Sequence, residues 1–523
     1  MSAGAPEERY PEGKATPKGL TTDERDSLAA TPLRVERGGG APTGNVRAVA
    51  EYEPMEAILV AYEGPSSWRA VLRDMGRHIT TTGDADLIVM CDSAGEASTA
   101  RSEFIAAGAD SRRVVTKVRQ TDTIWMRDYG PRYIYESGIR AIVDHTYNRP
   151  RPNDNLLPSF FGADRGETVY TIPLIHGGGN YHLDAIGGAA STRLIVNENP
   201  GLGASQIVRL WRDYQNVETE LFDALPAFVD STQHIDMWMQ IVSDDTIVIS
   251  DWPLEPGSSW DTTCDTTAAF YEAAGWNVTR TPAVRSGGTH YTFTNVVMCN
   301  DLVLIPEYDN IPSVYSQQAL AAWEATVPDK TVVQVDCDAL VTAAGVMHCI
   351  VMHVPANSGG ADPVAWVTAP KGGVYDAGDP VTIAWRTDDD EGVTAIDIFY
   401  RAGSGQPYEQ IASGIADTGS FEWIAPILST QEGTILVVAR DAEGNTGSDE
   451  TDTPIVVVGD PCVGTDLTGD GDVDLGDFGI FGAAFGSSAG DPSWDPRCDF
   501  DGDGDVDLGD FGLFGGQFGR TGC

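Results

Sequence analysis

The fold is decided by the alternation within residues 57–91, which read AILVAYEGPSSWRAVLRDMGRHITTTGDADLIVMC. The apolar runs 57–61 and 86–91 are short enough to be buried strands. Between them, residues 67–79 carry apolar side chains every three or four positions, as a helix with one buried face does. A strand, a helix and a strand in this order predict an α/β domain.

This alternation continues to about Pro355. Further strands are expected at 141–143, 193–196, 246–249, 302–305 and 331–335, and further helices at 96–107, 204–214 and 262–274. Together they predict an α/β catalytic domain over residues 45–356. Residues 1–44 are rich in Pro, Gly, Ala, Thr and charge and poor in aromatics, so we expect them to be disordered or a processed leader.

A different pattern begins after the linker at residues 356–361. Residues 362–458 lack helical periodicity and contain short alternating runs such as 381–385, 396–400 and 434–438, separated by turn residues. This spacing predicts an all-β sandwich of the immunoglobulin-like type. The Cys…Trp…Cys pattern of antibody domains is absent from it.

The last segment, residues 462–523, contains an internal repeat in which Asp466 recurs as Asp499. Each copy has oxygen-bearing side chains at the ligand positions of an EF-hand-type calcium loop, with glycine at the sixth position and aspartate at the twelfth. Without a cation so many carboxylates would repel one another, which favours calcium binding over a solvated acidic tail. The expected calcium ligands are Asp466, Thr468, Asp470, Asp472, Asp474, Asp477, Asp499, Asp501, Asp503, Asp505, Asp507 and Asp510.

These two loops, each followed by an apolar segment (478–485 and 511–518), resemble a dockerin domain. The resemblance implies a small α-helical domain with structural calcium and, as a candidate partner, a cohesin-like protein. Calcium is expected to serve these loops and not catalysis, because no comparable acidic loop lies near the motifs described below.

The composition limits the classes of binding partner and bears on the cellular location. The formal net charge of −45, from 78 acidic and 33 basic residues, argues against nucleic acids and anionic membranes. No apolar run reaches the 18 residues of a membrane span. Three of the eight cysteines (Cys462, Cys498 and Cys523) fall in the last segment, where one disulfide is expected. No signal peptide is visible in residues 1–40, so a secreted or extracytoplasmic location is expected from the modular architecture alone.

Three short motifs in the α/β domain are candidates for chemistry. Residues 125–131, WMRDYGP, leave Asp128 beside a tight turn, where a plain salt bridge is the simpler interpretation. His234 and Asp236 fall on one face of a strand-like segment, which suits an acid/base and a cation holder, or two metal ligands. Residues 177–180, GGGN, suit a tight turn beneath a site better than a phosphate cradle, because no Lys-Ser/Thr pair follows.

A fourth stretch, residues 345–352 (GVMHCIVM), places Cys349 at the head of an apolar run. At a loop-to-strand junction a thiol can face a cleft while the following β-branched residues anchor it. Taken alone, Cys349 is more simply a buried structural cysteine. The adjacent His348 is expected on the opposite face if the strand already begins there, so the base is better sought in His234.

Considered together, these motifs and Asn295 stand in the order found in guanidine-modifying enzymes of the pentein superfamily. From about residue 50 to Pro355 the chain resembles the agmatine deiminase and Porphyromonas-type peptidylarginine deiminase branch. The resemblance implies an α/β-propeller of five ββαβ-type modules around a pseudo-fivefold axis, with the site at its centre.

The same resemblance implies a role for each matched residue. Those roles are nucleophile for Cys349, general acid/base for His234, guanidinium binding for Asp128 and Asp236, a place beside the cysteine for Asn295, and lining of the substrate channel for Trp125. The residue types suit this chemistry, because carboxylates match the planar guanidinium in bidentate pairs. A bound cation together with a protonated histidine would also lower the pKa of the thiol.

The loop at residues 147–154 bears on the substrate. Its Arg149 and Arg151 could clamp a substrate carboxylate, although two surface bases are the plain alternative. The loop resembles the one by which bacterial peptidylarginine deiminases select C-terminal arginine, whereas agmatine has no carboxylate. We therefore expect a hydrolase of guanidino C–N bonds that converts peptidyl-arginine, C-terminal by preference, to citrulline and ammonia through a Cys-thiouronium intermediate, without a catalytic cofactor.

Three alternatives stay open at this point. The first is an agmatine deiminase, which converts agmatine to N-carbamoylputrescine in putrescine biosynthesis. The second is a pentein amidinotransferase, which needs an acceptor amine. The third belongs to another class: a binding or scaffold protein whose deiminase-like domain is inert.

Overall fold

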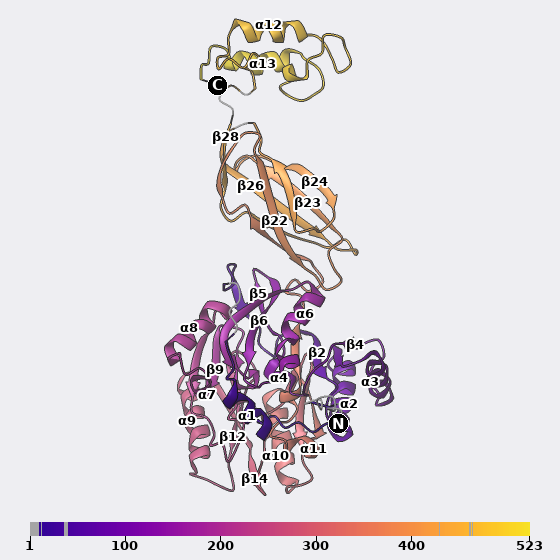
Figure 1. The fold of residues 1–523 in the computed structure, drawn as a ribbon, viewed down its shortest axis with the longest axis vertical. Coiled ribbons are helices and arrows are strands. Elements are labelled where there is room, and N and C mark those ends of the chain that lie inside the picture. The colour runs from indigo at the N-terminus through magenta and orange to yellow at the C-terminus, as the bar shows by residue number, and fades with distance from the viewer. Residues whose placement is uncertain are drawn as a thin grey trace, which may run out of the picture. The chain divides into compact units, whose positions relative to one another are not determined.

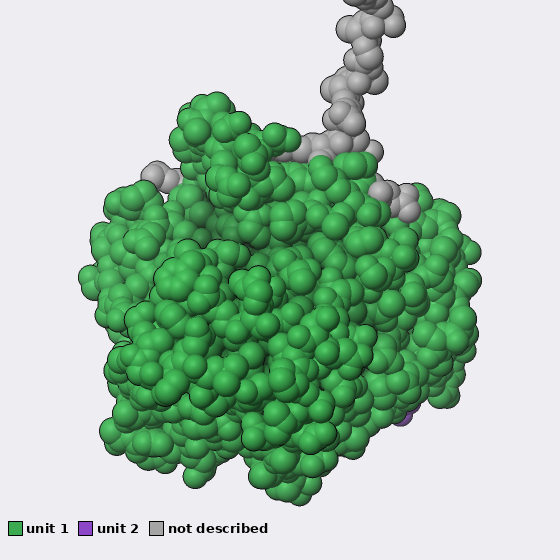
Figure 2. Space-filling model, turned by 90° about the horizontal axis from the view of Figure 1, so that it is seen from below, with its two compact units in different colours: residues 1–358 green, residues 359–523 purple. Residues whose placement is uncertain are grey.

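The computed structural model describes residues 10–11, 13–35, 40–427, 429–459, 462 and 464–522. The chain divides into two compact units, residues 1–358 (unit 1) and residues 359–523 (unit 2). Figure 1 shows the elements of both units, and Figure 2 shows one face of unit 1 in a space-filling view. None of the described helices is long and apolar enough to cross a membrane.

Five mixed sheets of three or four strands form the frame of the described part of unit 1. In spatial order they are β1 (Val46–Ala48), β5 (Arg132–Glu136), β6 (Ile139–Tyr147), β7 (Thr168–His176); β10 (Glu218–Phe222), β9 (Gly188–Thr192), β8 (His182–Leu183); β11 (Met239–Ile241), β12 (Thr246–Asp251), β13 (Asn277–Pro282); β16 (Val297–Cys299), β17 (Leu302–Glu307), β18 (Thr331–Asp336); and β19 (Met352–Pro355), β2 (Met55–Ala61), β3 (Asp86–Cys91), β4 (Val114–Val118). A small hairpin, β14 (Val284–Ser286) and β15 (Thr289–Tyr291), stands apart from them.

Each sheet repeats one order of strands. An antiparallel pair such as β5–β6 or β16–β17 is followed by a strand parallel to its second member. A parallel pair needs a crossover connection, which is usually a helix. The crossovers contain α6 (Leu157–Arg165), α8 (Ala204–Gln215), α9 (Ser259–Ala273), α10 (Val314–Thr326) and α2 (Ser66–Thr81), and α3 (Ala94–Ala106) adds a second crossover after β3. The result is five ββαβ modules.

The fifth module joins the two ends of the domain. Strand β19, from the end of unit 1, pairs antiparallel with β2, from near its beginning. The Cys349 stretch, which precedes β19, is therefore held beside segments from the start of the chain. This pairing is the reason that residues almost 300 positions apart can form one site.

Local sequence explains most of these elements. The apolar face of α2 is buried at Trp68, Val71, Leu72, Met75 and Ile79, the spacing that predicted the helix. A Cβ on Gly76 would lie 2.8 Å from the Leu87 side chain, so glycine there allows α2 to pack closely. The strand expected at 193–196 is wrong, because those residues form the helix α7 (Leu194–Glu198). A short apolar run does not distinguish a helix from a strand, and Ile195 is the one residue of α7 that is buried.

The N-terminal segment also differs from expectation. The predicted disorder does not hold for residues 14–30, which pack on unit 1 and include the helix α1 (Thr22–Ala30), indigo in Figure 1. Thr21 and Glu24 form a capping box at its start, so side chains satisfy two of the free backbone donors of the first turn. The remaining part of the expectation, a processed leader, stays a prediction.

Unit 2 begins with two sheets around a common apolar core. One contains β20 (Val364–Ala369), β22 (Pro380–Asp388) and β25 (Ser420–Ile424); the other contains β21 (Gly373–Asp376), β28 (Ile455–Val458), β26 (Thr430–Arg440), β23 (Ala395–Arg401), β24 (Glu409–Ile415) and β27 (Thr446–Glu450). Trp385 and Ile383 from the first sheet pack in the same cluster as Ile398 and Val437 from the second. This all-β arrangement agrees with the predicted sandwich, and its immunoglobulin-like class stays a prediction.

The last part of unit 2 contains two helices that follow the repeated loops. Helices α12 (Leu475–Ala484) and α13 (Leu508–Gln517) begin three residues before the expected apolar segments, because Asp474 and Asp507 cap them. Phe481 and Phe514 stack between the helices with ring centroids 5.2 Å apart. Cys462 is disulfide-bonded and Cys498 is a free thiol, whereas Cys523 lies outside the described residues.

Candidate active site

Each of the five modules contributes one polar residue. It stands in the turn that precedes the first strand of the module's antiparallel pair. These residues are Asp128 in α4 (Met126–Tyr129) before β5, Asn180 in η1 (Gly178–Asn180) before β8, Asp236 in η2 (Ile235–Met237) before β11, Asn295 before β16, and Cys349 in η3 (His348–Ile350) before β19. All are fully buried. Four of them were predicted as site residues from the sequence, and the fold brings all four together with His234.

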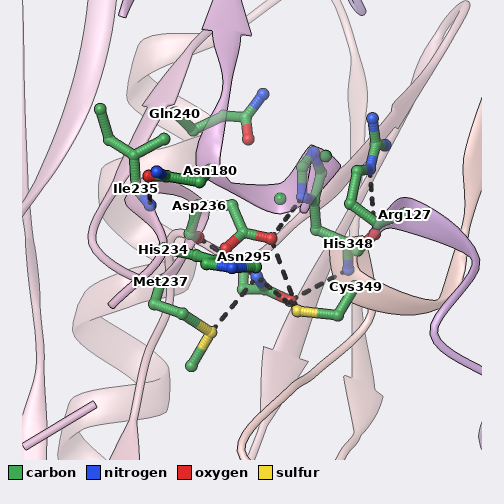
Figure 3. A network of polar contacts seen from close by, with 12 residues as sticks. Arg127, Asn180, His234, Ile235, Asp236, Met237, Gln240, Asn295, His348 and Cys349 are labelled. Atoms are coloured by element: carbon green, nitrogen blue, oxygen red, sulfur yellow. Dashed lines mark hydrogen bonds and ion pairs between the residues drawn. The ribbon is translucent and has the colours of Figure 1, made fainter. Parts of the chain in front are cut away.

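The thiol of Cys349 lies at the centre of this group. The Asn295 amide nitrogen lies 3.3 Å from Sγ, and the nearer Asp236 oxygen lies 3.5 Å from it. Figure 3 shows the Asp236 carboxylate between Cys349 and His348. Burial, and then the charge of Asp236, raise the pKa of the thiol to about 12, which Lys18 offsets only in part. The thiol therefore needs further positive charge and a proton acceptor before it can attack.

The two carboxylates expected to bind a guanidinium are held in ionised form. Burial alone would raise the pKa of Asp128 and of Asp236, but the neighbouring positive groups together, Lys18 foremost, outweigh burial and keep both pKa values below the usual range. One oxygen of each carboxylate, Oδ2 of Asp128 and Oδ1 of Asp236, is buried without a hydrogen-bond partner among the described residues. Buried acceptors normally have partners, so these two oxygens are suited to the N–H groups of a bound ligand.

His234 stands beside both carboxylates. Its Nδ1 lies 3.4 Å from Oδ1 of Asp128, and Nε2 has no hydrogen-bond partner among the described side chains. A Cβ on Gly179 would lie within 2.9 Å of His234, Asp128 and Asp236, so only glycine lets these three groups meet. The Gly177–Asn180 stretch is thus the tight turn beneath a site that the sequence predicted, with Asn180 Oδ1 accepting from the Ile235 amide.

One local prediction about the histidines is wrong, and the condition for another is not met. His234 and Asp236 do not sit on a strand, because η2 is a single 3-10 turn. The strand β19 begins only at Met352, so His348 does not face away from Cys349. Its Nδ1 instead lies 2.9 Å from Asp236, and its Nε2 lies 2.9 Å from Glu51.

Sequence reasoning missed this support behind Asp236. Glu51 also forms an ion pair with Arg127 at 2.5 Å, so a chain of Arg127, Glu51 and His348 orients the Asp236 carboxylate. Burial alone would raise the pKa of Glu51, but Arg127 and His348 lower it well below the usual value. Glu51 stands in the matched stretch near residue 50, and Arg127 in the WMRDYGP motif, but nothing in their spacing indicates that they meet.

The three residues predicted to bind substrate all contact the N-terminal segment. The Trp125 indole N–H donates to the Thr16 carbonyl at 2.9 Å, and Arg149 Nε donates to the Lys18 carbonyl at 3.1 Å. Arg151 pairs with Glu24 at 2.8 Å. All three predicted residues are buried, so Arg149 and Arg151 are not surface bases.

Lys18 is the residue that no motif indicated. Its side chain is 0% exposed, and Nζ lies 2.9 Å from Sγ of Cys349, 3.8 Å from Asp128 and 3.9 Å from Asp236. Burial alone would lower the pKa of Lys18, but Asp128, Asp236 and Cys349 together outweigh burial and raise it, so the ammonium is kept. The site thus binds a cation between two carboxylates and against a thiol.

The acidic loops of unit 2 form a second group of carboxylates. Asp499, Asp501 and Asp510 offer oxygens within 4.8 Å of one another, as do Asp505, Asp507 and Asp510. This oxygen-only donor set fits calcium. The first loop has Thr468 where the second has Asp501, so it contains one carboxylate fewer.

The ββαβ modules and the site of thiol, histidine and paired carboxylates define a pentein hydrolase of guanidino C–N bonds. The chain belongs to the family described as Porphyromonas-type peptidyl-arginine deiminase, which matches residues 47–355. It is 23% identical to the agmatine deiminase of Pseudomonas aeruginosa (strain LESB58) over 367 residues, 59% of this chain and 95% of that protein.

Solved structures show the same fold at lower identity. A variant of the agmatine deiminase of C. jejuni with substrate bound matches with a TM-score of 0.53 at 14% identity, over 61% of this chain and 99% of that one. Another structure of the C. jejuni agmatine deiminase matches with a TM-score of 0.51 at 15% identity, over 59% of this chain and 96% of that one. These matches agree with the expected fold class of unit 1.

Proposed function

We propose that this protein hydrolyses the guanidinium of arginine in peptides, giving citrulline and ammonia. The observation that carries the proposal is the Lys18 ammonium, held between Asp128 and Asp236 and against Cys349. A site that holds a cation in this position can hold a guanidinium, whose additional N–H groups would reach the two unpaired carboxylate oxygens.

The chemistry then follows from the residues around the guanidinium carbon. Cys349 gives its proton to His234 and Sγ bonds to that carbon; His234 then gives this proton to one terminal nitrogen, the C–N bond breaks, and the nitrogen leaves as ammonia. Water then attacks the same carbon and gives a proton to His234, and the S–C bond breaks. The product has an oxygen where a nitrogen was, and Cys349 is restored.

The main-chain contacts favour a peptide over agmatine. Arg149 contacts the carbonyl oxygen of the residue in the site, Lys18, which is where the carboxylate of a C-terminal arginine would lie. Agmatine has neither a main-chain carbonyl nor a carboxylate at this position. The Arg149→Ala variant is expected to raise the ratio of KM for C-terminal-arginine peptides to KM for agmatine by about tenfold, the loss of one charge-assisted contact.

One assay separates this function from its rivals. Ammonia and ureido products are measured with agmatine, free arginine, internal-arginine peptides and C-terminal-arginine peptides. We expect the peptides to be preferred; a preference for agmatine over every carboxylate or peptide substrate would replace the proposal with agmatine deimination. Turnover that requires an added acceptor amine would indicate an amidinotransferase, and absence of turnover in every variant described below would indicate an inert binding protein.

We further propose that calcium binds in the repeated loops of unit 2, that a cohesin-like protein is their partner, and that the protein acts outside the cytoplasm. The converging carboxylates of the second loop support calcium. A calorimetric titration of the full chain with calcium tests the first point; if no heat is released by the wild type, the loops are not calcium sites.

A further inference from the structure

Residues 16–19 lie in the active site as a ligand would. Lys18 points its side chain at Cys349 while the main chain on both sides of it is held by the catalytic domain. The contacts, in chain order, are Trp125 Nε1 to the Thr16 carbonyl at 2.9 Å, Arg151 to the Pro17 carbonyl at 2.8 Å, the Lys18 amide to the Ala343 carbonyl at 3.3 Å, Arg149 Nε to the Lys18 carbonyl at 3.1 Å, and Arg151 to the Gly19 carbonyl at 3.4 Å.

These hydrogen bonds are made to main-chain groups of the segment, so they do not depend on its side chains. The residue before Lys18 and the residue after it are both bound. A polypeptide of another sequence could make the same hydrogen bonds. The channel is consequently suited to a chain that continues beyond the reacting residue in both directions.

The position of Lys18 Nζ has a simple chemical meaning. In lysine, Nζ is the fifth atom after Cα along the side chain; in arginine, the fifth atom is Cζ, the guanidinium carbon. An arginine in place of Lys18 would bring Cζ to the place of Nζ, 2.9 Å from the thiol, which is close to the separation of reacting atoms in a near-attack geometry. Its terminal nitrogens would extend toward Asp128 and Asp236, now 3.8 and 3.9 Å from Nζ.

Lysine in this position cannot react. It supplies the positive charge that the carboxylates bind, but it has no electrophilic carbon between nitrogens for Cys349 to attack. It therefore occupies the place of the substrate without being converted.

The segment is anchored a few residues further on. Glu24, in the first turn of α1, is 1% exposed and forms an ion pair with Arg151 at 2.8 Å. Tyr10 donates a hydrogen bond to the same carboxylate at 2.9 Å. Arg151 thus links the anchor to the main chain beside Lys18.

We propose that residues 16–24 are a built-in substrate mimic: they occupy a channel for polypeptides with an internal arginine, and Lys18 blocks turnover until the segment is displaced or removed. The inference rests on the proposed function and makes its substrate class more specific, since the arginine is one with residues on both sides. An external substrate must compete with a segment of the same chain, so its apparent affinity falls by the fraction of molecules in which the channel is open.

The first test is relief of inhibition. Lys18→Ala removes the cation from the carboxylates, and Lys14→Ala is the matched control, because Lys14 lies two residues before the mimic and is exposed. We expect hydrolysis of an internal-arginine peptide by the full chain to rise at least about tenfold in Lys18→Ala and to stay unchanged in Lys14→Ala. Equal activity of Lys18→Ala and wild type would overturn the mimic but leave the hydrolase in place. No hydrolysis of any guanidine by either protein would overturn the proposed function itself.

The second test is whether the protein converts an arginine placed at position 18 of its own chain. In Lys18→Arg the new side chain should be converted to citrulline, seen by peptide mapping and mass spectrometry as replacement of NH by O at position 18. Because the reaction is intramolecular, its rate should not depend on protein concentration. The matched control, Lys14→Arg, should keep its arginine, and Cys349→Ser in the Lys18→Arg chain should prevent conversion.

If arginine at position 18 persists while Lys18→Ala hydrolyses an external arginine peptide, residues 16–19 do not lie as a substrate does. In that case the channel is blocked without being mimicked, and the inference is wrong. Conversion that accelerates with protein concentration would mean that one molecule acts on another, which also contradicts a segment bound in its own site.

Discussion

The molecule has two groups of aspartates that differ in what neutralises them. Asp128 and Asp236 are fully buried, and a lysine of the same chain supplies the positive charge. In the repeated loops of unit 2, Asp499 and Asp505 are partly exposed, and each offers an oxygen close to one of the buried Asp510. Burial makes an unpaired carboxylate costly, so the buried pair in unit 1 is preorganised for one cation, whereas the partly exposed carboxylates of the loops can stay hydrated without a cation.

The comparison also shows how differently the two groups are supported. Behind Asp236 stand His348, Glu51 and Arg127, each bonded to the next. In the loops, by contrast, Asp466 mainly accepts backbone amides of its own loop. A site that must hold a reacting carbon in place needs support from distant parts of the fold, whereas a metal loop can be built from consecutive residues.

The largest expected effect is on the reaction at the buried carboxylates of unit 1 and not on the loop carboxylates of unit 2. Cys349→Ser removes the thiol, and we expect hydrolysis of arginine peptides to fall by about 10³-fold or more, while calcium binding to unit 2 is unchanged. The matched control is Cys299→Ser, a buried cysteine in β16 outside the site, which should keep its turnover. Unchanged ammonia release by Cys349→Ser would show that Cys349 is not the nucleophile.

A smaller loss is expected when one carboxylate is neutralised. Asp236→Asn keeps the shape but loses the charge that binds the cation and pairs with His348, so kcat/KM should fall by about 10²-fold. The exposed Asp223→Asn serves as a control for the same chemical change. If Asp236→Asn and Asp223→Asn have the same kcat/KM, the buried carboxylate does not contribute to guanidinium binding.

The carboxylates of the repeated loops in unit 2 should bind calcium and should have no effect on the turnover of substrate. Chelation should leave turnover of arginine peptides unchanged, because no loop ligand lies in unit 1. Thr468→Asp adds the missing carboxylate to the first loop and should tighten its calcium affinity severalfold, measured by calorimetry. Loss of turnover on chelation, with the metal-loaded chain as control, would show that calcium serves catalysis after all.

The smallest effect concerns the anchor of the N-terminal segment. Burial alone would raise the pKa of Glu24, but the hydrogen bond and charge of Arg151, with hydrogen bonds from the Thr21 amide and Tyr10, together outweigh burial and lower the pKa to about 2, from the ordinary value of 4.5. A carboxyl group with a lowered pKa stabilises the docked state fully above pH 4.5, and this stabilisation is lost as the pH falls toward 2.

Hydrogen exchange of the α1 amides measures this docking. At neutral pH, Glu24→Gln should exchange several-fold faster than wild type, because Arg151 loses its buried partner. The difference between the two proteins should shrink below pH 4.5 and vanish toward pH 2. A difference that is constant across this range would mean that Glu24 does not anchor the segment through its charge.

Much of the site could be predicted because its residues stand at corresponding places. Asp128, Asp236 and Cys349 stand in short motifs, whereas Asn295 and the joint role of all four were expected only from the resemblance to the family; each of the four precedes the first strand of an antiparallel pair. The position of His348 could not be predicted, since it depended on whether β19 begins at the cysteine or, as found, three residues later. Strand boundaries are set by pairing with β2, which local sequence does not show.

Lys18 could not be predicted for a different reason. It stands in a stretch of Pro, Gly, Thr and Lys without periodicity, whose composition is typical of disorder. What orders the stretch is the complementary surface: Trp125, Arg149 and Arg151 bind its main chain, and Asp128 and Asp236 bind its cation. Order that comes from a partner surface leaves little trace in the sequence of the segment itself.

The most direct measurement is the release of ammonia and citrulline from an internal-arginine peptide by the full chain, with Lys18→Ala compared with wild type. The account predicts that both products appear in equal amounts and at least about tenfold faster with Lys18→Ala. Failure of both proteins to release ammonia from any guanidine would contradict it.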